Sequence, residues 1–162
     1  MYVSNSSTLI LLAKIDLLGR SLDMLKEIVI PKEVYEEFIK KSDSMDSLLI
    51  SKEINENRIK VVSTKKEEFK IILDNFRLHQ GEAAAYCIYK QGNYMAILTD
   101  DKELIKLCRL EKIPFICSLA VVLVLVSKKL ITKEQGLSKM EELYVHGRYS
   151  KEIYDYYKEK VK

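Results

Sequence analysis

The chain has 162 residues, of which 48% are hydrophobic and 31% are charged, and its net charge is +3 at pH 7. This composition excludes a disordered chain, and only 5 Gly and 2 Pro exclude a collagen-like or many-turned all-β protein. The length predicts a single domain over residues 1–162. A charge of +3 is too small to indicate a nucleic-acid partner by itself.

The sequence predicts a protein of the cytoplasm. Its longest strictly apolar run, residues 119–126, is far shorter than the roughly 20 residues that span a bilayer. The first residues lack the basic region of a signal peptide. Cys87, Cys108 and Cys117 form no Cys-x-x-Cys pair and each lies in an apolar stretch. We therefore expect buried thiols and neither a disulfide framework nor a thiolate zinc site.

In chain order, short apolar runs alternate with helical patterns. A strand is predicted at 2–4, followed by helices at 8–17 and 20–26, a strand at 28–30, a helix that begins at Pro31, a helix at 43–56 and a strand at 58–62. A helix capped by Ser63 or Thr64, with Glu67 completing a capping box, precedes a helix at 81–90 and a strand at 95–98. A helix at 102–111, a strand at 114–117 and helices at 118–128, 133–143 and 150–161 complete the chain.

Strands separated by helices need crossover connections. The pattern therefore predicts an α/β fold with a central, mainly parallel sheet and helices on both faces. Ligands of such sheets bind beyond the carboxyl ends of the strands.

Two aspartates follow the apolar strand that ends at Leu98. Asp100 and Asp101 are therefore expected at the carboxyl edge of the sheet. Either could cap the next helix, because Asp is a preferred N-cap residue. Two adjacent carboxylates repel each other, which favours a shared cation, and one residue could fill both roles.

Glu82 and Glu37 are the other acids in unusual surroundings. Glu82 opens a segment whose next seven residues are Ala, Tyr, Cys or Ile, so it is expected beside buried apolar surface. It could simply stabilise the start of a helix through the helix dipole, or its charge could need a partner. Glu37 borders the apolar face of its helix, whereas Glu36 points away from that face.

Asn5 ends the first strand at the same edge, and Ser6 and Ser7 follow it. All three are good helix caps, and an amide or hydroxyl oxygen could also serve as a neutral ligand. Acids gathered without basic partners favour a shared ion, and hard oxygen ligands select Mg²⁺ or Mn²⁺.

These segments resemble the PIN-domain ribonucleases, in particular the prokaryotic branch related to VapC-type toxins. The resemblance lies in Val3-Ser4-Asn5-Ser6-Ser7, Ile30-Pro31-x-x-Val34-x-x-Glu37-Phe38, Gly81-Glu82-Ala83 and Leu98-Thr99-Asp100-Asp101. The later stretches 118–131 and Gly147-Arg148-Tyr149-Ser150 also look like the end of that branch, so the resemblance covers nearly the whole chain.

The resemblance implies a Rossmann-like fold, an acidic pocket for Mg²⁺ or Mn²⁺ and endonuclease action on RNA. It places the four acidic positions at Asn5, Glu37, Glu82 and the Asp100-Asp101 pair, with Asp101 the better placed of the two. Ser6 and Ser118 are expected to support the site. The usual first residue is Asp, so Asn5 removes one negative charge, and we expect weaker metal binding.

Two functions follow as hypotheses. In the first, the protein is a metal-dependent endoribonuclease in which Glu37, Glu82 and Asp101 hold the ion, Asp100 supports them and Asn5 positions water or substrate. In the second, Asn5 marks a catalytically impaired module that binds RNA or a protein. The resemblance also implies a toxin role, an antitoxin partner and a homodimer.

Overall fold

The computed structural model describes residues 1–41, 43–147 and 149–162, so Arg148 of the stretch quoted above lies outside the described residues. The sheet has five parallel strands in the order β3-β2-β1-β4-β5. The strands are β1 (Tyr2–Ser4), β2 (Ile28–Pro31), β3 (Ile59–Val62), β4 (Ile97–Leu98) and β5 (Phe115–Ile116). In register, Val3 pairs with Val29 on one side and with Ile97 on the other.

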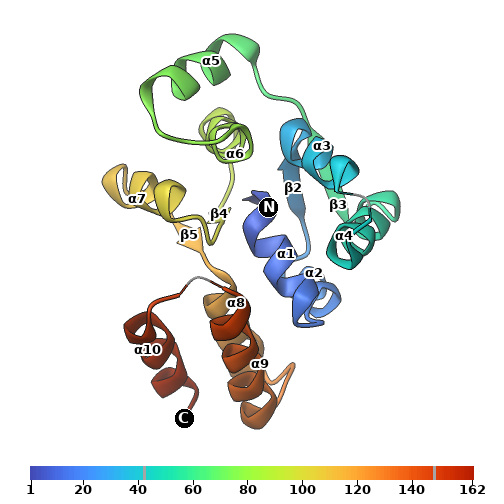
Figure 1. Ribbon diagram of the computed structural model, residues 1–162, viewed down its shortest axis with the longest axis vertical. Helices are drawn as coiled ribbons and strands as arrows, with labels where there is room; N and C mark the ends of the chain where they lie inside the picture. The colour runs from blue at the N-terminus through green and yellow to red at the C-terminus, as the bar shows by residue number, and fades with distance from the viewer. Residues whose placement is uncertain (42, 148) are drawn as a thin grey trace.

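Helices connect all successive strands of the sheet (Figure 1). They are α1 (Ser6–Lys14), α2 (Leu18–Leu25), α3 (Lys32–Lys40), α4 (Met45–Asn55), α5 (Lys66–Asn75), α6 (Gln80–Gln91), α7 (Lys102–Leu110), α8 (Ser118–Ser127), α9 (Lys133–His146) and α10 (Lys151–Val161). The last three pack on one another at one end of the molecule, while α5 packs on α6 at the other.

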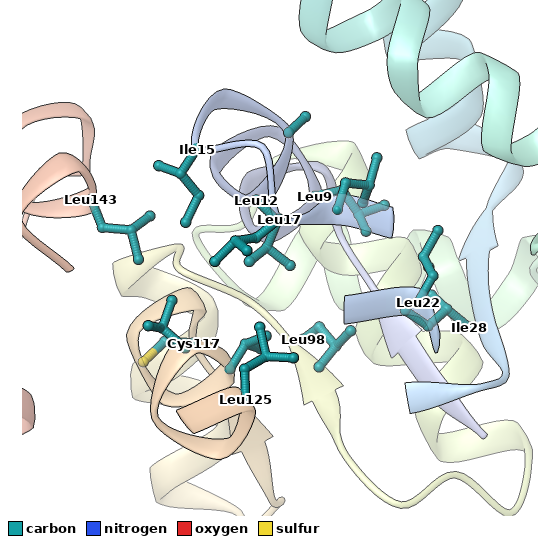
Figure 2. Packing of buried hydrophobic residues seen from close by; sticks show 14 of the residues in the cluster. Leu9, Leu12, Ile15, Leu17, Leu22, Ile28, Leu98, Cys117, Leu125 and Leu143 are labelled. Carbon is teal, nitrogen blue, oxygen red and sulfur yellow. The ribbon is translucent and has the colours of Figure 1, made fainter. Parts of the chain in front are cut away.

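Helices cover both faces of the sheet, and alternate strand residues, which point to opposite sides, pack in two separate cores. Val3, Val29 and Ile97 pack with α6 and α7, whereas Ile28, Ile30 and Leu98 pack with the helices of the other face. Figure 2 shows this second core, in which Leu9 and Leu12 of α1, Leu98 of β4 and Leu125 of α8 come together. The predicted α/β fold with a central parallel sheet and two covered faces is confirmed.

Several helix starts differ from the sequence prediction, among them α2 at Leu18 instead of residue 20 and α4 at Met45 instead of residue 43. Helix α1 begins at Ser6 rather than Thr8, and Pro31 ends β2 and occupies the N-cap of α3 instead of its first turn. The capping box before α5 is wrong: this helix begins at Lys66 and has no side-chain cap. Its expected cap, Thr64, instead donates a hydrogen bond to Glu33 Oε1 at 3.0 Å, because a tertiary partner is available.

The three cysteines are buried and free, as their apolar surroundings predict. Within the described ranges, none of the helices has the length and hydropathy that crossing a membrane requires.

Candidate active site

The site lies next to β1, where the order in which the chain adds strands to the sheet reverses. The chain leaves β1 to one side toward β2 and later adds β4 on the other side of β1. Ligands of open α/β sheets bind beyond the carboxyl ends of the strands at such a switch point. Asn5 directly follows β1, and Thr99, Asp100 and Asp101 directly follow β4. The backbone N–H of Asn5 donates to the carbonyl of Leu98 at 3.3 Å and holds the two chain ends together.

Asn5 is fully buried and occupies the N-cap position of α1 without a side-chain cap. Its amide Oδ1 accepts a hydrogen bond from the hydroxyl of Ser7 at 2.8 Å. That hydroxyl in turn accepts one from the backbone N–H of Asp100 at 2.9 Å. Asn5 Nδ2 is buried and has no partner among the described residues. A buried, unpaired donor is costly, so this amide is a position where a different side chain would fit better.

Asp101 is the N-cap of α7, and its Oδ1 accepts from the backbone N–H of Leu104 at 2.8 Å. The predicted capping role is therefore confirmed for this member of the pair. The backbone N–H of Asp101 bonds to Thr99 Oγ1 at 3.1 Å, which orients the turn after β4. Only Oδ1 is used by the cap, and within the described parts of the chain Oδ2 has no hydrogen bond.

Glu82 lies in the first turn of α6. Burial raises the pKa of this carboxyl above its ordinary value, and the negative charges of Asp101 and Glu37 raise it further. Its Oε2 is buried and has no hydrogen-bond partner among the residues that the structure describes. Glu82 therefore carries a partly desolvated charge whose nearest charged neighbours include two further acids.

Glu37 reaches this site from α3 because position 81 has no side chain. A Cβ on Gly81 would lie 2.5 Å from Glu37 Oε1 and 3.3 Å from Val34 Cγ2. The carboxylate thus sits against the first turn of α6, where exposed N–H groups and the helix dipole favour a negative charge. We name Glu37, Glu82 and Asp101 the acidic trio; they come from α3, α6 and the turn after β4.

Asp100 faces a different set of groups. Its Oδ2 accepts from Thr8 Oγ1 at 2.6 Å and from Ser118 Oγ at 2.8 Å. The backbone N–H of Ser118 lies 3.1 Å from both carboxylate oxygens, and the hydroxyl of Tyr149 donates to Oδ1. Burial raises the pKa of Asp100, while the hydrogen bonds from Thr8, Tyr149 and Ser118 oppose that rise. Ser118 therefore contacts Asp100, whereas the hydroxyl of Ser6 has no hydrogen bond within the described residues.

The donor set of the acidic trio fits a hydrated divalent cation. No lysine, arginine or histidine in residues 1–41, 43–147 and 149–162 forms an ion pair with Asp100 or with a member of the trio. In the same ranges, no group of three or more His, Cys, Asp or Glu side chains is placed so that it could hold a metal ion, and this includes the acidic trio as it stands. Mg²⁺ keeps several waters and usually binds one or two carboxylates directly, so members of the trio would hold it partly through these waters.

A groove of about 1180 Å³ adjoins Asp100 and Asp101, whereas Glu37 and Glu82 are not among its lining residues. Asp100 and Asp101 lie in its wall, and α1, α7 and the C-terminal segment (residues 149–162) form its sides. Its lysine and arginine residues are Lys14, Lys102, Lys106 and Arg109, and its aromatic residues are Phe115, Tyr149, Tyr156 and Tyr157. The guanidinium of Arg109 lies 5.7 Å from the centroid of the Phe115 ring, a cation–π contact that holds a flat, positive group in the groove.

A family model described as a PIN domain matches residues 1–162. The chain belongs to the PIN-domain family. PIN domains are typically nucleases that use divalent metals, so membership indicates a nuclease-type function. Searches of the curated proteins and of the solved structures found no significant match.

Sequence reasoning missed the role of three residues in this PIN domain. Gly81 gives Glu37 its place, and Thr8 and Tyr149 bind Asp100. A glycine just before Glu82 was visible, but its requirement follows only from the approach of α3. Thr8 and Tyr149 lie 92 and 49 residues away from Asp100 along the chain, so no local pattern connects them.

Proposed function

We propose that this PIN domain is a metal-dependent endoribonuclease that hydrolyses RNA phosphodiester bonds with Mg²⁺ or Mn²⁺. The observation that carries the proposal is the acidic trio, which forms no ion pair among the described residues. The positive charge of His79 only partly offsets the raised pKa of Glu82, whose Oε2 is buried and unpaired. A cation removes the mutual repulsion of such carboxylates. Family membership supports the nuclease class.

In this proposal Glu37, Glu82 and Asp101 hold the cation, and Asn5 positions water or substrate through its amide. When bound, the ion supplies Lewis acidity and lowers the pKa of water beside the phosphodiester. Asp101 Oδ1 caps α7 by accepting from the backbone N–H of Leu104, which leaves Oδ2 for the site. Glu82 is partly buried, so water screens its charge poorly. A cation therefore interacts with it more strongly than with an exposed carboxylate.

The groove beside Asp100 and Asp101 supports RNA as the substrate. Basic side chains attract the phosphate backbone, and aromatic rings offer stacking surfaces for unpaired bases. Both kinds of residue line the groove, including Lys102, Arg109 and Tyr156. Tyr156 is 58% exposed, and Lys160 Nζ lies 4.8 Å from the centroid of its ring, so a positive charge accompanies this aromatic surface.

Cleavage of a labelled RNA by purified protein, with Mn²⁺ or with a chelator, tests the proposal. Asp101→Asn should lower the rate at least about 100-fold, because a lost ligand removes several kcal/mol of transition-state stabilisation. Asn caps helices as well as Asp does, so the fold should persist. Glu103→Gln is the matched control, since it removes an exposed charge from the same helix. Equal cleavage by Asp101→Asn, or cleavage that survives chelation, rejects the proposal.

Asn5 favours a second candidate function, a catalytically impaired module that binds RNA or a protein. Its amide oxygen is already engaged by Ser7, and an amide nitrogen is not a cation ligand. This candidate expects RNA binding without metal dependence and without turnover. Cleavage of RNA by the wild-type chain contradicts it.

The toxin role, the antitoxin and the homodimer stay predictions of the resemblance. Co-expression with the neighbouring reading frame, followed by purification on a tag of this chain, tests for an antitoxin. Light scattering of the purified chain gives the oligomeric state.

A further inference from the structure

The two neighbouring aspartates differ in how much of each carboxylate is in use. An ionised carboxylate offers about four lone-pair sites. Asp100 accepts from Thr8 Oγ1, from the Ser118 hydroxyl and backbone N–H, and from the Tyr149 hydroxyl. Its sites are therefore filled, whereas the carboxylate of Asp101 accepts one hydrogen bond from the described residues.

The partners of Asp100 come from elements that are distant in the sequence. Thr8 lies in α1, Ser118 begins α8, and Tyr149 lies two residues before α10. Thr8 and Ser118 are fully buried, and the hydroxyl oxygens of Ser118 and Tyr149 are 2.6 Å apart. One carboxylate thus joins two helices and the C-terminal segment behind the turn that carries Asp101.

The same residue is connected to Asn5. The backbone N–H of Asp100 donates to Ser7 Oγ, which donates to Asn5 Oδ1. A displacement of Asp100 therefore moves the N-cap residue Asp101 through the chain and Asn5 through Ser7.

We propose that Asp100 is a positioning residue of the acidic site rather than one of its cation ligands, and that Tyr149 is part of the same anchor. This inference rests on the proposed function of the acidic trio. The anchor fixes the turn after β4, and with it the direction in which Asp101 and Asn5 present their side chains. The C-terminal segment is then a component of the site, although it contributes no ligand.

The sign of the effect of Tyr149→Phe on Mn²⁺ affinity separates the two roles. If Asp100 were a ligand, removal of the hydroxyl would free a lone pair on Oδ1, and the affinity would rise or stay unchanged. If Asp100 positions the site, Tyr149→Phe and Asp100→Asn should each weaken Mn²⁺ binding about threefold to tenfold. The Mn²⁺ affinity of the double variant should then be no lower than that of the single variant with the lower affinity, because both changes break the same hydrogen-bonded link. Asp101→Asn should abolish binding under the same conditions.

Mn²⁺ binding is measured by electron paramagnetic resonance on the full chain, with Tyr144→Phe as a matched hydroxyl deletion outside the anchor. An affinity that rises in Tyr149→Phe, or losses in Asp100→Asn as large as in Asp101→Asn at unchanged thermal stability, overturns the inference.

A second readout needs no metal. In ¹H–¹⁵N spectra of the chelated protein, Tyr149→Phe should shift the Asn5 side-chain amide and the Asp101 backbone amide, whereas Tyr144→Phe should leave both in place. Unshifted signals overturn the positioning role. If the wild-type chain binds no Mn²⁺ and cleaves no RNA, the proposed function fails, and this spectrum still decides whether the anchor orients these residues.

Discussion

Gly81→Ala should separate the stability of this protein from its chemistry. The new Cβ would lie 2.5 Å from Glu37 Oε1, whereas ordinary contacts begin near 3.4 Å, so the carboxylate must retreat by about 1 Å. Glu37 can do so, because its carboxylate is the end of a flexible side chain. Val34 is buried and lies 3.3 Å from the new atom, which is tight but needs only a small adjustment.

The stability terms of Gly81→Ala nearly cancel. Alanine favours a helix over glycine by about 1 kcal/mol, and overpacking beside Val34 costs about 1 kcal/mol. One kcal/mol corresponds to about 2–4 °C in Tm for a chain of this size, so we expect a Tm within about 4 °C of the wild type. Cleavage should fall about 100-fold, because misplacing a catalytic group by about 1 Å has an effect of that order.

The assay compares Tm, Mn²⁺ affinity and RNA cleavage for Gly81→Ala and for Gly19→Ala. Gly19 also lies in a helix, α2, and a Cβ there would meet nothing within 4 Å. Gly19→Ala should therefore cleave like the wild type. Wild-type cleavage by Gly81→Ala would refute the placement of Glu37 in the site, and a Tm loss above about 10 °C would refute the stability argument.

Three further substitutions test the site and its surroundings. Asn5→Asp should raise Mn²⁺ affinity about tenfold by calorimetry, because a carboxylate can bond to Ser7 with one oxygen and to the ion with the other; no gain contradicts a role for position 5. The pKa of Glu82 is raised, so the folded chain binds more protons than the unfolded chain above pH 4.5, and stability falls as the pH rises to the folded pKa. In chelator, Glu82→Gln should therefore raise Tm at pH 7 and not at pH 4, and an equal change at both values opposes this cause. Thr8→Val removes a buried donor to Asp100 and should cost about 1.5–3 kcal/mol in urea unfolding, with an unchanged value as the contrary result.

The sheet could be predicted from the sequence because strands that are buried on both faces appear as short apolar runs in the local sequence. Each strand is a short apolar run between helical patterns, and this is enough to predict crossover connections. The start of α5 could not be predicted in this way. Its capping pattern was present, but Thr64 bonds to Glu33 of α3 instead. A tertiary partner outweighs a local cap, and only the fold reveals that partner.

Among the site residues, an acid that stands in an apolar stretch of sequence was easier to predict than one whose position depends on a distant residue. Glu82 stood out because a charged residue opened an apolar helix, and its raised pKa agrees with that setting. The position of the Glu37 carboxylate depends on the missing side chain at Gly81, and no hydrophobic periodicity indicates this dependence. The carboxylate occupies this position because α3 packs on α6, a contact between segments some 45 residues apart.

The Asp100-Asp101 pair shows why adjacent acids need not share a role. Successive residues of an extended chain point to opposite sides. One carboxylate therefore faces Thr8, Ser118 and Tyr149, while the other caps α7 and lies near Glu82. Two adjacent acids in a sequence suggest one shared cation site. The hydrogen-bond donors around Asp100, however, already stabilise its negative charge without a cation. Substitution of Asp101 thus tests the chemistry of the site, and substitution of Asp100 tests the frame that holds it.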